Sequence, residues 1–214
     1  HNIFREVLKM EKNLNQVEIT TLTDIPAKTG LGSSGSFTTG LIKSIYSYKK
    51  KFIDKIDLAE KACDIEINKL KQPSGKQDQY ISVYGGISEF FINKSGKVKP
   101  KSINLKGEII DKLKDNLLLY FTGFSRNSSK ILNQQNKETL SNDKKIIENL
   151  DFVKELAIEV KKSLLKGDLK QFGNLMNQHW KYKMSRSKNM SNSTINNFYD
   201  YALKNGAVGG KIVG

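Results

Sequence analysis

Residues 26–36 form a loop rich in glycine and hydroxyl side chains, with the sequence Pro-Ala-Lys-Thr-Gly-Leu-Gly-Ser-Ser-Gly-Ser. The alternating run at 17–23 before it predicts a strand, and apolar residues at helical spacing after it predict a helix over 34–49. Glycines let backbone N–H groups approach an anion, and a helix that starts at Ser33 or Ser34 adds its positive end. Serine hydroxyls bind phosphate oxygens or Mg²⁺. This strand, loop and helix therefore predict a phosphate site.

Two other glycine-rich motifs, and a tight turn without function, have to be compared with this loop. A Walker A loop requires Gly-Lys-Ser/Thr, but Gly35 is followed by Ser36. The dinucleotide fingerprint Gly-x-Gly-x-x-Gly does match 30–35, and Asp54 stands near the place of its ribose-binding acid. That fingerprint needs a second strand ending at the acid, whereas Asp54 lies in a lysine-rich connection that leads into another helix. A tight turn that uses its glycines only for backbone geometry is the remaining alternative.

The charge of the chain bears on its partners. The net charge is +14, which would suit a nucleic-acid-binding module. Only three of the basic residues are arginines and the lysines are dispersed, which favours solvated faces, so we do not expect nucleic acid as a partner. No run of eighteen apolar residues and no signal peptide is present, which predicts a cytoplasmic protein without membrane contact. The single Cys63 is expected to be a small core residue.

Periodicity and turn residues predict the remaining elements. We expect Asp57 and Ser74 to cap two helices in the first half, and Asp168 to cap one in the second. The helices are expected at 2–12, 57–70, from about Ser74 to Gly85-Gly86, 128–136, 143–166, 169–184 and 193–204, and the strands at 87–92, 98–105 and 117–121.

Two carboxylates stand out in this pattern. Glu66 lies within the apolar stripe of the helix at 57–70, so its carboxylate needs a cation, a metal or a hydrogen-bond partner there. Asp78 falls in the first turn of the next helix, where the helix dipole stabilises its charged form. A structural salt bridge for Glu66 and a plain dipole interaction for Asp78 are the alternatives.

Other features of the second half are less specific. His179 shares a helix face with apolar residues and is expected in the core, without zinc. Trp180, Lys181 and Lys183 could cover a sugar phosphate or lie at the helix surface. The chain starts with His1 and ends in an apolar run, so we expect it to be a piece of a longer protein.

The pattern Pro-x-x-x-Gly-Leu-Gly-Ser-Ser at 26–34 resembles the ATP-binding motif of the GHMP kinases. Further blocks along the chain resemble the D-glycero-α-D-manno-heptose 7-phosphate kinase branch: Ile65-Glu66, Gly75–Tyr80, Thr122–Ser129, His179-x-x-x-Lys183 and Gly206–Lys211. The resemblance implies an α+β GHMP kinase fold, with a half similar to ribosomal protein S5 domain 2 at 1–112, which binds ATP, and a ferredoxin-like half at 113–214. Both halves would be truncated at the chain ends.

The resemblance also implies site residues. Asp78 matches the catalytic aspartate, which orients the attacking sugar hydroxyl and accepts its proton. Glu66 with Ser33 or Ser34 would hold Mg²⁺. Substrate contacts would come from Lys76, Gln77, Thr122, Gly123, Ser125, Arg126 and Lys183, among which Arg126 suits the substrate's own phosphate. ATP would be bound by Lys28, Gly30, Leu31, Gly32, Ser33, Ser34, Gly35 and Ser36. Lys28 and Ser36 depart from the residues that are common in relatives, and both changes fit a phosphate site.

The activity so implied is the ATP- and Mg²⁺-dependent phosphorylation of the anomeric hydroxyl of heptose 7-phosphate to the 1,7-bisphosphate. This step serves nucleotide-activated heptose and surface polysaccharide biosynthesis. A GHMP kinase of a fucose- or mannose-type sugar and a basic nucleic-acid-binding module are the alternatives. The partners would be ATP and a sugar phosphate, with a homodimer left open. The family's first and third motifs have no counterpart here, which implies that this chain alone is poorly active.

Overall fold

The computed structural model describes residues 1–11, 14, 16–25, 29–123, 132–133, 139–140, 144–185 and 190–213. The chain divides into two compact units, His1–Ile103 and Asn104–Val213, which we describe separately as unit 1 and unit 2. Of the helices in these described residues, none combines the length and the apolar character needed to cross a membrane.

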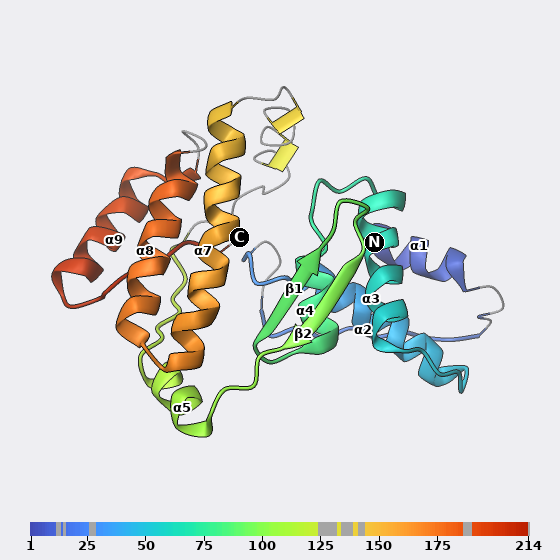
Figure 1. Ribbon diagram of the computed structural model, residues 1–214. Helices are drawn as coiled ribbons and strands as arrows, with labels where there is room; N and C mark the ends of the chain where they lie inside the picture. The colour runs from blue at the N-terminus through green and yellow to red at the C-terminus, as the bar shows by residue number, and fades with distance from the viewer. Residues whose placement is uncertain are drawn as a thin grey trace. The chain divides into compact units, whose positions relative to one another are not determined.

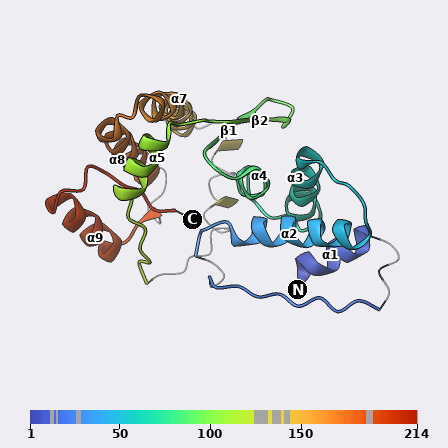
Figure 2. The ribbon, with the colours of Figure 1, turned by 90° about the horizontal axis from the view of Figure 1, so that it is seen from below.

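Unit 1 combines helices with a β-hairpin (Figure 1). Helix α2 lies between α1 on one side and the pair α3 and α4 on the other (Figure 2). Strands β1 and β2 pair in antiparallel fashion, with Phe90 opposite Pro100, and α4 packs against them. The elements are α1 (Asn2–Met10), α2 (Ser33–Tyr48), α3 (Lys55–Cys63), the π-helical turn η1 (Asp64–Lys69), α4 (Gln77–Tyr84), β1 (Ser88–Ile92) and β2 (Val98–Ser102).

The apolar stripes of the helices in unit 1 meet in two clusters. The larger one joins α1, α2, α3 and η1, with Val7 and Ile42 fully buried at its centre. The smaller one places Cys63 and Tyr80 against Val98 of the hairpin. Cys63 is therefore a core residue as predicted, only 2% exposed, and burial raises the pKa of its thiol to about 12.

The caps in unit 1 differ from the prediction. Helix α3 begins at Lys55, so Asp54 is its N-cap residue. The Asp54 side chain accepts a hydrogen bond from the Asp57 N–H at 2.9 Å. Asp57 thus lies inside the helix, and the prediction that it is the cap is wrong. Asp54 ends no strand, which agrees with the rejection of a dinucleotide fold. Ser74 does not cap α4 either: Lys76 is the N-cap residue, and the buried Ser74 hydroxyl has no hydrogen-bond partner within the described ranges.

The predicted strands at 87–92 and 98–105 are confirmed as β1 and β2, with the second one shorter. In their turn the Asn93 side chain accepts hydrogen bonds from the Ser95 hydroxyl and the Lys97 N–H, and Gly96 takes a φ of +77°. A side-chain-closed turn of this kind is the local signal that made the hairpin predictable.

The two other predicted strands are wrong. Residues 17–23 and 117–121 form no strand, because no segment of the described residues pairs with either of them. Several of their apolar side chains are consequently left in solvent, such as Leu22, which is 94% exposed, and Leu118, which is 93% exposed, whereas Ile19 packs against the larger core cluster. Alternation and apolar character identify a segment that can join a sheet, but strand formation also requires a neighbouring backbone with free hydrogen-bonding groups.

The described residues of unit 2 form helices joined by irregular segments, without a strand. Helices α7 and α8 lie side by side (Figure 1), with Phe152 and Tyr182 stacked at a ring distance of 3.8 Å. The predicted cap of α8 is confirmed, since the Asp168 side chain accepts the Gln171 N–H at 2.9 Å. The helix expected around 128–136 lies largely outside the described residues. The elements are α5 (Gly107–Asp115), α7 (Lys144–Lys166), α8 (Leu169–Ser185) and α9 (Ser193–Lys204).

The segment at 206–213 runs along α8 at very close range. A Cβ atom at Gly209 would lie 2.0 Å from the Gly173 carbonyl oxygen, and a Cβ atom at Gly173 would lie 2.8 Å from the Val208 side chain. Further along, Lys211 Nζ lies 3.3 Å from His179 Nδ1, and Lys183 Nζ donates to the Ile212 carbonyl at 3.2 Å. Two facing glycines thus fix the register of this segment on the helix.

We expect Gly209→Ala to lower the free energy of unfolding of unit 2 by about 1–3 kcal/mol, which is the usual cost of forcing extra atoms into a packed site. Gly210→Ala is the matched control, because its Cβ would meet only Tyr199, at an ordinary 3.6 Å. Urea unfolding followed by the fluorescence of the single tryptophan, Trp180, measures both variants in unit 2, where this side chain is 1% exposed. Equal stability of the two variants would contradict the close contact.

Candidate active site

The glycine-rich loop leads into α2 with a geometry that suits the binding of an anion at the start of this helix. Gly32 is the N-cap residue, with a φ of +70°, and Gly30 has a φ of +78°. No side chain of a described residue caps the helix, and its first turn contains no acidic residue. The first N–H groups of α2 are therefore not taken up by a side-chain cap, and the helix dipole favours a negative group there. Leu31 and Ser33 belong to the same turn, and Lys28 lies outside the described residues.

Glu66 stands beside this helix end on the π-helical turn η1. It is 2% exposed, as its place in the apolar stripe predicted. One carboxylate oxygen, Oε2, accepts a hydrogen bond from the Ser34 hydroxyl. The other, Oε1, is buried and has no hydrogen-bond partner among the residues that the structure describes. A π-turn is often found at functional sites, and a buried carboxylate oxygen without a partner in the described part of the chain calls for an explanation, of which an ion is one.

Asp78 lies against the loop from the other side. A Cβ atom at Gly32 would be 3.7 Å from Asp78 Oδ2, so the carboxylate borders the loop directly. A Cβ atom at Gly35 would be only 2.9 Å from the Asp78 backbone carbon, which explains why α2 has a glycine where α4 crosses it. The first turns of α2 and α4 therefore meet at Gly35, and Asp78 is brought to the loop by this contact.

The Glu66 carboxylate affects the pKa of Asp78. The atoms that surround the Asp78 carboxylate raise its pKa, and the negative charge of Glu66 raises it further. Asp78 nevertheless remains exposed as a residue, so a substrate can reach it. Two neighbouring carboxylates of which one is buried are a favourable setting for a divalent cation and for a general base.

Hydroxyl groups tie α2 to α4 in the same region. The Ser36 hydroxyl lies 3.1 Å from that of Ser82, which in turn donates to the Asp78 carbonyl at 2.7 Å. Ser36 thus contacts the helix of Asp78, and its predicted contact with ATP stays a prediction. Ser82 was not singled out from the sequence, because a serine in a short helix carries no local signal of a partner 46 residues earlier.

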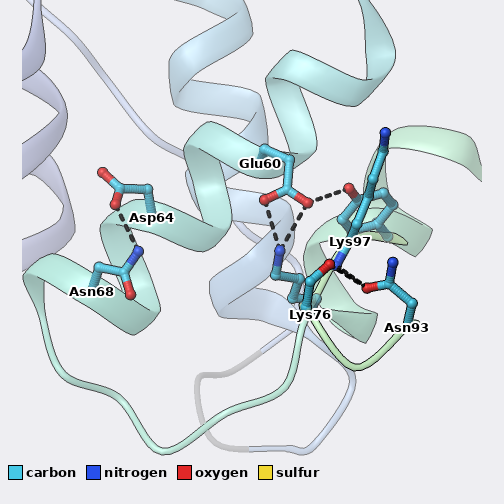
Figure 3. A network of polar contacts seen from close by, with 8 residues as sticks. Glu60, Asp64, Asn68, Lys76, Asn93 and Lys97 are labelled. Carbon is cyan, nitrogen blue, oxygen red and sulfur yellow. Dashed lines mark hydrogen bonds and ion pairs between the residues drawn. The ribbon is translucent and has the colours of Figure 1, made fainter. Parts of the chain in front are cut away.

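Lys76 forms an ion pair with Glu60, a residue that the sequence did not indicate as functional. Its Nζ atom lies 2.8 Å from Glu60 Oε2 and 2.9 Å from Oε1 (Figure 3). Glu60 points from α3 to the start of α4. Gln77 is exposed at the first position of α4. The substrate contacts predicted for Lys76 and Gln77 stay predictions.

The remaining predicted substrate residues belong to unit 2. Thr122 and Gly123 follow the apolar run at 117–121, and Gly123 has a φ of +82°. Lys183 lies on α8 and is partly buried. Trp180 is not a surface residue, because it is 1% exposed in a cluster with Met190 and Ile195. Ser125 and Arg126 lie outside the described residues.

The donor set beside the loop suits Mg²⁺. Mg²⁺ takes oxygen ligands. Glu66 Oε1 is a buried carboxylate oxygen to which no described residue donates a hydrogen bond, and the Ser34 hydroxyl lies next to it. The residues present therefore fit a metal ion that accompanies a phosphate at the start of α2. Taken together, unit 1 has a helix terminus for phosphate, oxygen ligands for a cation and an accessible carboxylate.

Comparison with known proteins relates the chain to a family model and to several solved structures. Residues 2–86 match the family model described as GHMP kinases N terminal domain. Solved GHMP kinases share the α+β fold of the chain. A heptose 1-phosphate kinase from Bacteroides thetaiotaomicron matches all of the chain with a TM-score of 0.74 at 25% identity. The mevalonate kinase of Leishmania major matches 86% of it with a TM-score of 0.63 at 17% identity, which concerns the fold alone.

Among the curated relatives, D-glycero-alpha-D-manno-heptose 7-phosphate kinase of Campylobacter jejuni is 29% identical along the whole chain. The L-fucokinase/L-fucose-1-P guanylyltransferase of Bacteroides fragilis is 26% identical over 77% of the chain and 17% of its own length. The chain spans 62% of the Campylobacter protein and 60% of the Bacteroides heptose kinase structure.

Proposed function

We propose that the complete protein is an ATP-dependent kinase of D-glycero-α-D-manno-heptose 7-phosphate, and that it makes the 1,7-bisphosphate. The observation that carries this proposal is the position of the Asp78 carboxylate against the glycine loop, beside the Ser34–Glu66 pair. The likeness to the Campylobacter heptose 7-phosphate kinase supports the choice of sugar.

In this mechanism the uncapped start of α2 and the loop from Gly30 to Ser36 bind the ATP phosphates through their N–H groups. The sugar hydroxyl oxygen forms a bond to the γ-phosphorus, and the bond from that phosphorus to the bridging oxygen breaks as ADP leaves. Asp78 holds the attacking hydroxyl and accepts its proton. Its raised pKa makes it a better base than an ordinary aspartate.

Glu66 and the adjacent serine hydroxyls would hold Mg²⁺ at this place. Bound Mg²⁺ would neutralise charge on the phosphates during transfer. The Ser34 hydroxyl donates to Glu66, so these two candidate ligands lie side by side. Ser33, at the first position of α2, offers a second hydroxyl.

For the sugar phosphate we propose a site that includes Arg126, because a guanidinium binds phosphate through two parallel hydrogen bonds. Lys183 would add a point charge. The other substrate contacts remain those that the sequence predicted, from Lys76, Gln77, Thr122, Gly123 and Ser125.

A second candidate substrate is suggested by the name of the structural relative, a heptose 1-phosphate kinase. Phosphorylation would then take place at a different hydroxyl with the same phosphate loop and the same base. The two candidates differ only in which end of the sugar faces Asp78.

The test is to incubate the complete protein with Mg²⁺-ATP and a panel of heptose 7-phosphate, heptose 1-phosphate, fucose and mannose, and to follow ADP release and phosphorus NMR. A new anomeric phosphate formed from heptose 7-phosphate is the expected result. Transfer to heptose 1-phosphate or to a free sugar instead would retain the kinase and replace the substrate. The absence of transfer to any of them would overturn the proposed function.

A further inference from the structure

The first turn of α4 carries Asp78, but this helix has little of its own to hold that turn in place. α4 spans only Gln77–Tyr84, and its N-cap residue Lys76 makes no side-chain capping bond. The preceding residues 71–75 form no helix or strand. A short helix with an uncapped start tends to fray at that end. The position of Asp78 therefore depends on contacts from other elements.

Glu60 of α3 provides such contacts on both sides of Asp78. Its carboxylate accepts two hydrogen bonds from Lys76 Nζ, at 2.8 and 2.9 Å. It also accepts one from the Tyr80 hydroxyl, at 2.5 Å. Lys76 precedes Asp78 by two positions and Tyr80 follows it by two. One side chain thus holds both ends of the turn on which Asp78 sits, and Figure 3 shows how Glu60 and Lys76 face each other.

Helical geometry turns this contact into a constraint on Asp78. Residues four apart lie on the same face of a helix, whereas a residue halfway between them lies about 200° around the axis, on the opposite face. Glu60 therefore holds the face of the first turn that points away from the loop. Asp78 is on the other face, next to Gly32 and Gly35 of α2.

Charge explains why a carboxylate occupies this position. A lysine at the start of a helix is disfavoured by the dipole, and the negative Glu60 offsets it. Burial acts to raise the pKa of Glu60, but the hydrogen bonds from Lys76 and Tyr80 and the lysine charge outweigh it, so the pKa is lowered. The carboxylate therefore remains ionised when both partners bind it.

Stability does not require this contact. The side chains of Lys76 and Glu60 are 25% and 39% exposed, and ion pairs with such exposure add little to the free energy of unfolding. The packing of α4 comes from Tyr80, which is 1% exposed and lies 5.7 Å from the ring of Phe90. The polar contact therefore determines geometry more than stability.

We propose that Glu60 is a positioning residue, which places the Asp78 carboxylate at the phosphate loop by holding Lys76 and Tyr80. This inference rests on the proposed kinase function. Lys76 would then support Asp78 through Glu60, in addition to the substrate contact proposed for it.

The test compares Glu60→Gln with Glu11→Gln in the complete protein. Glu11 forms a similar ion pair in unit 1, with Lys49 at 2.9 Å, but it does not contact α4. We expect Glu60→Gln to lower kcat about 10- to 100-fold, the effect of a small misplacement of a reacting group, while KM for ATP stays within about twofold. Tyr80→Phe removes a single hydroxyl and should show a smaller fall of the same kind. Glu11→Gln should keep the kcat of the wild type.

The same substitution is then made in an Asp78→Asn background. If Glu60 acts through Asp78, Glu60→Gln should lower the residual turnover by less than about twofold there, because groups that act as a unit are not additive. An equal fold-loss in both backgrounds would mean that Glu60 acts in another way and would overturn the proposal. So would a Glu60→Gln variant with the kcat of Glu11→Gln. Wild-type protein without phosphoryl transfer to any sugar would instead overturn the proposed function.

Discussion

Replacing Asp78 by asparagine in the complete protein is expected to leave ATP binding intact and to lower turnover by about 10²- to 10⁴-fold, the range that a general base contributes. Asparagine has nearly the same shape as aspartate, so the contact with Gly32 and Gly35 is kept. It cannot accept the proton of the sugar hydroxyl. Nucleotide affinity by calorimetry and ADP release under saturating sugar phosphate measure the two quantities separately.

Two outcomes would contradict this role. Undiminished turnover would remove Asp78 from the mechanism. A parallel loss of ATP affinity would mean that the residue supports the loop and does not act on the substrate. Ser82→Ala is a suitable control in α4, because the Ser82 hydroxyl donates to the Asp78 carbonyl without reaching its carboxylate. It should reduce turnover far less.

Glu66→Gln is expected to have opposite effects on activity and stability. Loss of the charge weakens the hold on Mg²⁺, and a few kcal/mol of lost charge stabilisation corresponds to about 100-fold in turnover. In metal-free protein, however, the substitution removes a buried charge, one oxygen of which has no partner in the part of the chain that the structure describes, while the amide oxygen can still accept from Ser34. The metal-free variant should therefore be at least as stable as the wild type.

Turnover as a function of Mg²⁺ concentration and urea unfolding of metal-free protein by circular dichroism check both halves of this expectation. Glu11→Gln is the contrasting control, because it breaks a partly buried ion pair with Lys49 and should lower stability without altering the response to Mg²⁺. A Glu66→Gln variant that is clearly less stable than the wild type in the absence of metal would indicate a structural role for Glu66.

Local rules explain why much of the fold could be predicted. Gly32 needs its positive φ, Asp168 caps the helix that follows it, and the Asn93 turn closes on itself. Each of these is decided by neighbours in the chain. The burial of Glu66 was predictable for the same reason, since it follows from helical spacing alone.

What could not be predicted depends on distant partners. The run at 117–121 has the composition of a strand, but pairing is decided by another segment. Glu60 and Lys76 are 16 residues apart, and no spacing rule connects them. Gly35 looked like part of a phosphate loop, whereas the structure also uses it to let the α4 backbone approach. Such contacts follow from the packing of helices and carry no signal in a single sequence.

The burial of Cys63 has a practical use for experiments on this protein. A thiolate is the species that reacts with maleimides, and a thiol with a pKa of about 12 and 2% exposure supplies almost none of it. The chain has no other cysteine, so its native sequence should react very little with a maleimide label. Cysteines introduced at the exposed positions of Lys94 in unit 1 and Lys204 in unit 2 would take up a pair of dyes. Energy transfer between the dyes would then report any change of distance between the units when nucleotide is added.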